Sequence, residues 1–213
     1  MEEFILKHRQ TILKALTCLV LTAVVSLCLG PTSLFKRAEA QEQEDVVVTA
    51  TIEAWMDFQV SPTSTSITPA LVGIDGSVSI GSTADINLQV GTNNPLGWNV
   101  TARGTNDGLY STTTDYTIST VSATSTLAAG TDGYGANAES TLAGATIGNL
   151  YDYYGSNTVG EITTTTANTL VDKSSANGMG SVANMQIRAA ATSTVPAATN
   201  YSDTITLTAS GGT

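Results

Sequence analysis

Side chains that commonly carry catalysis are scarce beyond residue 40 of this 213-residue chain. The single histidine, His8, and both cysteines, Cys18 and Cys28, lie before that point. A serine or cysteine nucleophile needs a neighbouring base, and zinc needs His or Cys ligands. Beyond residue 40 the only basic residue next to a serine is Lys173, which precedes Ser174. We therefore predict that the protein is not an enzyme.

Acidic residues in predicted loops are the remaining candidates for a metal site. They lie in Asn106-Asp107-Gly108, in Asp132-Gly133 and at Asp152. Their carboxylate and carbonyl oxygens are ligands that Ca²⁺ prefers, but Asp-Gly pairs are also typical of ordinary turns. EF-hand spacing is absent, and no pair of carboxylates stands out as the acid and base of a glycosidase. We expect no cofactor, with calcium as the only metal that the composition favours at all.

Aromatic side chains are the candidates for ligand binding. Tyr151, Tyr153 and Tyr154 are clustered, and together with Trp98 they could form a platform for a carbohydrate. Core packing is the alternative for Trp98 and for Trp55, because an indole carries a large apolar area. For the tyrosines the sequence leaves two interpretations open, a plug that packs a loop and an exposed patch.

The first 40 residues have the organisation of a secretory signal peptide. A basic region at Lys7–Lys14 precedes the apolar run Ala15–Gly30, and Ala38-Glu39-Ala40 supplies the small-x-small cleavage pattern. We predict cleavage after Ala40 and an exported protein, either secreted or at the cell surface. The alternative is an uncleaved anchor, although the apolar run is short for a membrane span of about 20 residues.

The rest of the chain is acidic and long enough for one domain, which we place at residues 46–213. The whole chain has a formal net charge of −10, and the only basic residues beyond residue 40 are Arg103, Lys173 and Arg188. Such a surface repels phosphate backbones and anionic lipids. We therefore expect no nucleic-acid partner, and no membrane contact after signal cleavage.

The clearest strand signal lies in Asp85–Gly104. Apolar residues occupy every second position in two runs, which are Ile86, Leu88 and Val90 and then Trp98, Val100 and Ala102. This period is typical of half-buried strands. The intervening Gly91–Gly97 is rich in residues that favour turns. We predict a β-hairpin with a long loop.

Two other regions bracket the predicted domain. After the acidic leader Gln41–Asp45 comes Val46–Ala54, a predicted strand that continues to Ser61-Pro62. One face of this strand carries Val46, Val48, Ala50, Ile52 and Ala54. Near the C-terminus, Val182–Ala191 and Tyr201–Ala209 predict a second hairpin. Short strands separated by turn signals predict an all-β fold, a single immunoglobulin-like antiparallel β-sandwich.

Three stretches of the chain resemble bacterial cell-surface β-sandwiches. They are Ile52–Phe58 with its aromatic residues, Gly97–Ala102, and the closing Pro196–Thr208. The chain is similar to WxL-domain proteins of Gram-positive surfaces, and its closing strand resembles those of spore-coat-U-like and pilin-like secreted domains. Trp98-Asn99-Val100 stands where W-x-L would be expected, and Ala198 stands where the closing pattern has glycine. The resemblance implies a surface location and, from the WxL proteins, peptidoglycan binding.

These observations lead us to expect a non-enzymatic structural or adhesive surface protein. Its partners would be other copies of itself or components of the cell envelope. The strand Val46–Ala54 could complete the sheet of the next copy, because an unpaired sheet edge accepts strands. Pairing within its own domain is the alternative, since this needs no partner. The second hypothesis is a carbohydrate- or cell-wall-binding module that uses Tyr151, Tyr153, Tyr154 or Trp98.

Overall fold

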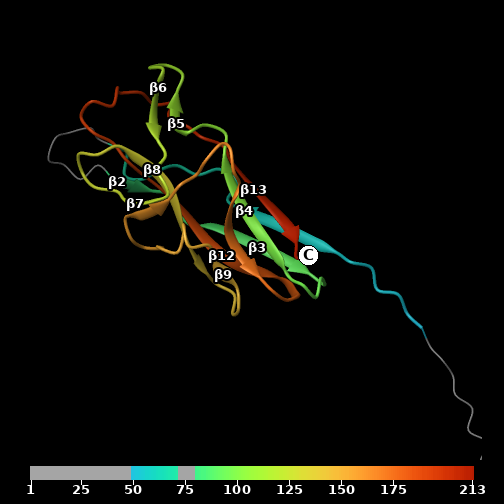
Figure 1. The fold of residues 1–213 in the computed structure, drawn as a ribbon. Coiled ribbons are helices and arrows are strands. Elements are labelled where there is room, and N and C mark those ends of the chain that lie inside the picture. Colours follow the sequence, from blue (N-terminus) through green and yellow to red (C-terminus); the bar gives the residue numbers. More distant parts are fainter. Residues whose placement is uncertain (1–48, 72–79) are drawn as a thin grey trace, which may run out of the picture. The chain divides into compact units, whose positions relative to one another are not determined.

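The computed structural model of the chain describes residues 49–71 and 80–213 (Figure 1). The predicted signal peptide and the acidic leader lie outside these ranges. Within them all regular structure is β, and no helix has the length and apolarity that crossing a membrane requires. Residues 51–213 belong to one compact unit.

The described residues form thirteen β-strands. In chain order these are β1 (Met56–Ser61), β2 (Ile80–Ser82), β3 (Ile86–Thr92), β4 (Trp98–Gly104), β5 (Gly108–Ser111), β6 (Tyr116–Ser119), β7 (Thr124–Thr126), β8 (Gly133–Ser140), β9 (Thr146–Ile147), β10 (Thr158–Gly160), β11 (Asn168–Lys173), β12 (Asn177–Ala190) and β13 (Ile205–Gly211). Every pair of neighbouring strands runs antiparallel. The predicted all-β antiparallel fold is confirmed.

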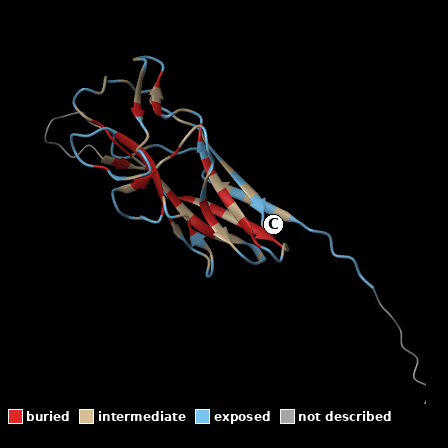
Figure 2. Ribbon diagram, in the orientation of Figure 1, coloured by how far each residue is buried: buried red, intermediate tan, exposed pale blue. Residues whose placement is uncertain are grey.

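The strands form two main sheets. The seven-stranded sheet, hereafter the large sheet, has the order β1-β3-β12-β8-β10-β7, with β2 beside β12. The four-stranded sheet, hereafter the small sheet, has the order β13-β4-β11-β9, and β5 and β6 form a separate pair. One cluster of buried apolar side chains includes Leu88 and Met185 from the large sheet and Trp98 and Val100 from the small sheet. This shared core makes the fold a β-sandwich, and Figure 2 shows buried residues alternating with less buried ones along β4.

The two predicted hairpins are wrong, although their strands are real. β3 lies in the large sheet and β4 in the small sheet, so the residues between them carry the chain from one sheet to the other. β12 and β13 are likewise divided between the two sheets. The period-two pattern is correct in both cases, because it determines which face of a strand is buried and not which strand lies beside it. Facing sheets are about 10 Å apart, a distance that the loop Asn93–Gly97 is long enough to cross.

The central strand β8 has little apolar signal in its sequence, GYGANAES. Its first six residues, Gly133–Ala138, predict only a short strand or a turn. It pairs with β12 along its whole length, and its first six residues are buried. Small residues are needed there because other main chain comes close: a Cβ on Gly135 would lie 2.5 Å from the carbonyl oxygen of Gly160. The close approach of other main chain therefore explains why this strand has small residues where an apolar pattern would be expected.

Candidate functional site

Residues 49–55 are all exposed, and within the described part of the chain they belong to no strand. The strand predicted over Val46–Ala54 is therefore not formed in its described residues. Three positions of its predicted apolar face are exposed, namely Ala50, Ile52 and Ala54. The other two, Val46 and Val48, lie outside the described residues. Among the described residues of this segment, the large apolar side chain of Ile52 is 84% exposed.

Residues 49–55 lie in no strand because the strand beside them in the large sheet, β3, has ended. β1 begins at Met56, opposite Thr92, and Thr92 is the last residue of β3. From Asn93 onward the chain turns towards the small sheet. Strand propensity mainly reflects packing against neighbouring strands, so a β-branched sequence without a neighbour does not form a strand by itself.

Asn93 holds the main chain just before β1 in the way that a strand partner would. Its side-chain Oδ1 accepts a hydrogen bond from the Trp55 N–H at 2.8 Å, and its Nδ2 donates to the Glu53 carbonyl at 2.7 Å. The Thr92 hydroxyl donates to the Trp55 carbonyl at 2.8 Å. We call this set of three bonds the Asn93 clamp. It fixes the path of Glu53–Trp55 as a continuation of the pairing between β1 and β3.

Exposed apolar side chains gather around the clamp. Trp55 is 47% exposed, and its indole lies over Gly91, where an added Cβ would be 3.0 Å from the ring and 2.7 Å from the Cα of Met179. Core packing of Trp55, one of the two sequence-based alternatives, is therefore wrong. Two further large apolar side chains are exposed, Met179 in β12 and Leu96 in the loop that follows Asn93. This end of the sandwich thus carries most of the exposed large apolar side chains of the described residues.

The three clustered tyrosines do not form one surface. Tyr151 is 0% exposed, and its hydroxyl donates to the carbonyl oxygen of Glu161 at 2.8 Å. Burial raises the pKa of Tyr151 to about 12. The Tyr154 hydroxyl donates to Asp85 Oδ1 at 2.7 Å, while Tyr153 is 38% exposed. The sequence left two interpretations open for the tyrosines, a packing plug and an exposed patch. The first describes Tyr151, which is buried, and the second describes Tyr153, which lies at the surface.

Trp98 is a core residue, as the core-packing alternative predicted. It is 2% exposed, and its indole N–H donates to Asn177 Oδ1. Asn177 in turn donates from Nδ2 to the carbonyl oxygen of Val90 at 2.8 Å, which links β4 to both β12 and β3. Carbohydrate binding stays a prediction, but Trp98 and Tyr151 are not placed to form a platform with Tyr153.

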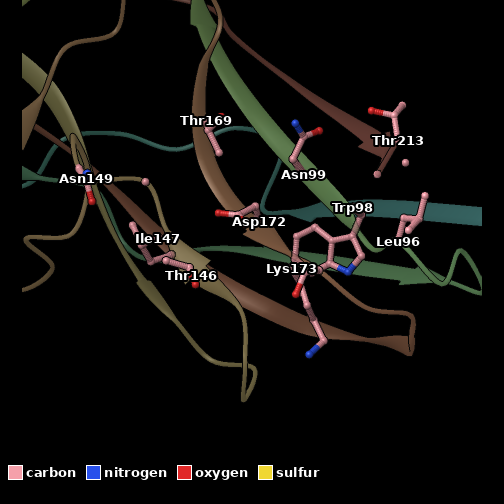
Figure 3. A pocket seen from close by; sticks show the side chains of 14 residues that line it. Leu96, Trp98, Asn99, Thr146, Ile147, Asn149, Thr169, Asp172, Lys173 and Thr213 are labelled. Atoms are coloured by element: carbon pink, nitrogen blue, oxygen red, sulfur yellow. The ribbon is translucent and has the colours of Figure 1, made fainter.

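A pocket of about 580 Å³ lies at the end of the small sheet where β4 begins (Figure 3). Its lining includes Asn99, Asp172 and Lys173, and Asp172 pairs with Asn99 in the sheet. The buried Oδ1 of Asn99 has no hydrogen-bond partner among the described residues. Lys173 Nζ donates to the carbonyl oxygen of Ala143 at 3.1 Å, which directs the ammonium group to main chain rather than to a serine hydroxyl. The pocket therefore shows polar lining without the geometry of an activated nucleophile.

Two of the three acidic residues considered as calcium ligands, Asp107 and Asp132, accept hydrogen bonds within the protein, whereas Asp152 is exposed. Asp107 Oδ1 accepts from the Thr164 hydroxyl at 2.7 Å. Asp132 accepts from the Tyr116 hydroxyl at 2.9 Å and from the Thr192 N–H at 2.6 Å. In the described ranges, no three His, Cys, Asp or Glu side chains gather as a metal site would require. Calcium binding stays an untested expectation.

Among the described acidic residues, Asp203 accepts the most hydrogen bonds, and sequence reasoning did not single it out. Its Oδ1 accepts from the N–H groups of Thr105, Asn106 and Thr204 at 3.2, 2.9 and 2.8 Å. Its Oδ2 accepts from the Tyr134 hydroxyl at 3.1 Å. Burial raises the pKa of Tyr134, and the neighbouring Asp203 carboxylate adds to that rise. Asp203 thus ties the start of β13 to the end of β4 and to β8.

Comparison with known proteins adds no family to these observations. No protein-family model matches the chain, and a search among curated proteins finds no match. Function must therefore be inferred from the geometry of the chain itself.

Proposed function

We propose that the chain is an exported, non-enzymatic structural or adhesive surface protein that assembles by giving its N-terminal segment, residues 46–54, to a second copy. The observation that supports this most directly is the exposure of a strand-forming sequence. Six of the nine residues in the segment are β-branched, a type enriched in strands. The described ones, residues 49–54, are exposed and lie in no strand.

The segment is well suited to pairing with another molecule. An extended, uncharged, β-branched stretch is the kind of sequence that adds to an open sheet edge. Val46–Ile52 carries no charge, and the first acid after it is Glu53. The Asn93 clamp holds the chain at Glu53 and Trp55, so the residues before the clamp start from a fixed point on the sandwich. A tethered strand of this kind loses less entropy on pairing than a free one.

Export and the absence of catalysis are supported by the sequence. The first 40 residues carry the basic, apolar and small-x-small pattern of a signal peptide. Removal of that leader would take away His8, Cys18 and Cys28, which are all the His and Cys side chains of the chain. The acidic domain that remains would face an exterior environment without thiol or imidazole chemistry.

The experiment is to express the whole chain in a bacterial secretion host and to study the exported product. Sequencing of its N-terminus tests the cleavage after Ala40. Light scattering over a concentration series, with negative-stain microscopy, measures assembly. We expect oligomers or filaments from the wild type, and a folded monomer when residues 46–54 are deleted.

The matched control is Ile52→Val, which keeps a β-branched apolar residue at a position that is 84% exposed. It should assemble like the wild type. Circular dichroism should show the same β content for the deletion variant, because residues 49–54 lie in no strand of the described fold. A wild-type protein that stays monomeric at every concentration, or a deletion variant that assembles unchanged, contradicts the proposal.

A further inference from the structure

We infer that the free edge of β13 is the acceptor for the N-terminal segment (residues 46–54) of a second copy. This inference rests on the proposed function, since it names the surface that receives the donated strand.

The end strands of the two sheets differ in how well they can accept a partner. In the large sheet these are β1 and β7, and in the small sheet β13 and β9. β7 has three residues and β9 has two, and very short edge strands are poor templates for strand addition. β1, with six residues, and β13, with seven, are the long edges of the described fold.

Of the two long edges, β13 has fewer features that discourage pairing. β1 carries the charge of Asp57 and is followed directly by Pro62. β13 reads ITLTASG, with no charge and no proline. Charges and prolines on edge strands are the common protection against strand addition. The donor segment is itself acidic at Glu53 and is preceded by Asp45, so like charges would further disfavour β1.

The main-chain groups of β13 that have no partner in β4 can be identified from the hydrogen bonds at the two ends of the β13–β4 pair. The Thr105 N–H donates to the Thr204 carbonyl at one end, and the Gly212 N–H donates to the Gly97 carbonyl at the other. The register between these points is unbroken, and bonding alternates along an antiparallel pair. Even-numbered residues of β13 therefore bond to β4. The N–H and C=O groups that point away from β4 belong to Ile205, Leu207, Ala209 and Gly211.

The inward side chains of β13 are covered only in part. Ile205, Leu207 and Ala209 pack against the core cluster, but each is only partly buried. A strand added beside β13 would place alternate side chains over the same edge of the core. The donor segment has apolar residues at alternate positions for this, with two valines, two alanines and Ile52. The added strand would thus cover apolar surface that the sandwich leaves open.

The Asn93 clamp explains why the donor comes from another molecule. β13 lies beside β1 in Figure 1, and a Cβ on Gly211, the last residue of β13, would lie 4.0 Å from Met56 Cε, at the start of β1. To lie along its own β13, the segment would have to reverse direction between Ile52 and Met56. Glu53 and Trp55 are held there in continuation of β1. Folding back would break these bonds, whereas donation to a second copy keeps them.

The test uses two variants of the exported full chain. Ala209→Pro removes one outward N–H of β13 and leaves its bonds to β4 in place, and proline is tolerated on strand edges in this orientation. Ile52→Pro disables the donor strand and leaves the acceptor intact. Ala198→Pro, in a loop outside every strand, is the matched control for the first substitution. Circular dichroism and thermal unfolding confirm that each variant is folded.

We expect each of the two variants alone to be monomeric and Ala198→Pro to assemble like the wild type. Mixing Ala209→Pro with Ile52→Pro should give a one-to-one heterodimer, with twice the monomer mass by light scattering. Ala209→Pro should weaken self-association at least about tenfold, because an added strand loses a main-chain donor and a compatible register.

The outcomes separate the two proposals. A monomeric wild type overturns the proposed function itself. An assembling wild type whose Ala209→Pro variant also assembles overturns only the assignment of β13, since another edge must then accept the strand. If Ala209→Pro does not fold, Ala209→Cys can be mixed with Ala50→Cys, Ile52→Cys or Ala54→Cys, because the chain beyond residue 40 has no cysteine. Disulfide-linked dimers with at least one donor support β13, and no dimer with any donor overturns it.

Discussion

Asn93 bonds to the main chain of Trp55 at the point where β3 ends, with its Oδ1 accepting the Trp55 N–H at 2.8 Å. The asparagine side chain thus supplies the hydrogen bond that the next residue of β3 would have supplied, had the strand continued. The Asn93 side chain makes one more main-chain hydrogen bond, to Glu53, and the described residues before Glu53, residues 49–52, are exposed. The clamp therefore marks the boundary between the chain that the sandwich holds and the chain that is free to pair elsewhere.

Replacing Asn93 with alanine should free the main chain of Glu53 and Trp55 from the clamp without unfolding the domain. The clamp bonds lie on an exposed segment, so their loss should lower the free energy of unfolding by at most about 1 kcal/mol. Hydrogen exchange should instead show faster exchange of the Trp55 amide, which loses its acceptor. Asn149→Ala, at an exposed loop position, is the matched control and should leave that amide unchanged. Unchanged exchange in Asn93→Ala would show that the clamp does not hold the segment in solution.

The two tryptophans should differ sharply in their contributions to stability. Trp98 is 2% exposed and donates to Asn177, so Trp98→Ala should cost about 3–5 kcal/mol through the cavity and the unpaired amide. Trp55 is 47% exposed, and Trp55→Ala should cost less than about 1 kcal/mol. Denaturant unfolding measures both values. The fluorescence of Trp55→Phe, which reports Trp98, should be blue-shifted relative to that of Trp98→Phe. Equal destabilisation by the two alanine variants would contradict the different burial of these residues.

The sequence predicted which residues are buried better than it predicted which strands are neighbours. Leu88 and Val100 alternate with polar residues, and both are buried as expected. The sequence did not show that their strands lie in different sheets. A Gly- and Asn-rich connection has the same composition whether it returns to one sheet or crosses to another. The propensity of Val46–Ala54 was also misleading, since a strand needs a neighbour and β3 ends at Thr92.

The parts of the site that were missed depend on contacts between distant residues. The Asn93 side chain bonds to residues 38 and 40 positions away in the sequence, and asparagine in a turn is ordinarily explained by local backbone needs. Asp203 likewise accepts hydrogen bonds from Thr105, just after β4, and from Tyr134 in β8, whereas the sequence shows only one acid near a closing strand. Both residues are polar, close to strand ends and rich in acceptor groups. Neither has a periodic pattern that could have indicated its role.

Asp203 should be important for stability because three main-chain N–H groups converge on one of its oxygens. Asp203→Ala leaves these donors and the Tyr134 hydroxyl without their partner, and we expect a loss of about 3 kcal/mol. Asp203→Asn keeps an acceptor oxygen and should lose about 1 kcal/mol. Asp152→Ala, at an exposed acid, should change stability by less than about 0.5 kcal/mol. Chemical denaturation of the four proteins measures the series, and equal values for Asp203→Ala and Asp152→Ala would contradict the role of Asp203 as a joint between the sheets.

Tyr151 and Tyr154 should make stability fall in alkaline solution. Burial raises the pKa of Tyr151 from 10.0 to about 12, and burial and the bond to Asp85 raise that of Tyr154 to about 12. In the unfolded chain both groups lose their protons near their ordinary pKa, so at higher pH the unfolded state binds fewer protons than the folded one. Stability should therefore be independent of these groups below pH about 10 and should fall as the pH rises towards about 12.

Tyrosine-to-phenylalanine variants test this pH dependence residue by residue. Tyr151→Phe keeps the ring in the core and loses the bond to the Glu161 carbonyl, so it should be less stable at neutral pH. Because phenylalanine does not ionise, Tyr151→Phe should also lose less stability than the wild type on going from pH about 9 to about 11. A difference titration of tyrosinate absorbance between the two proteins should show the missing transition near pH 12. A missing transition near pH 10 instead would mean that the Tyr151 hydroxyl is in contact with water and not enclosed by the core.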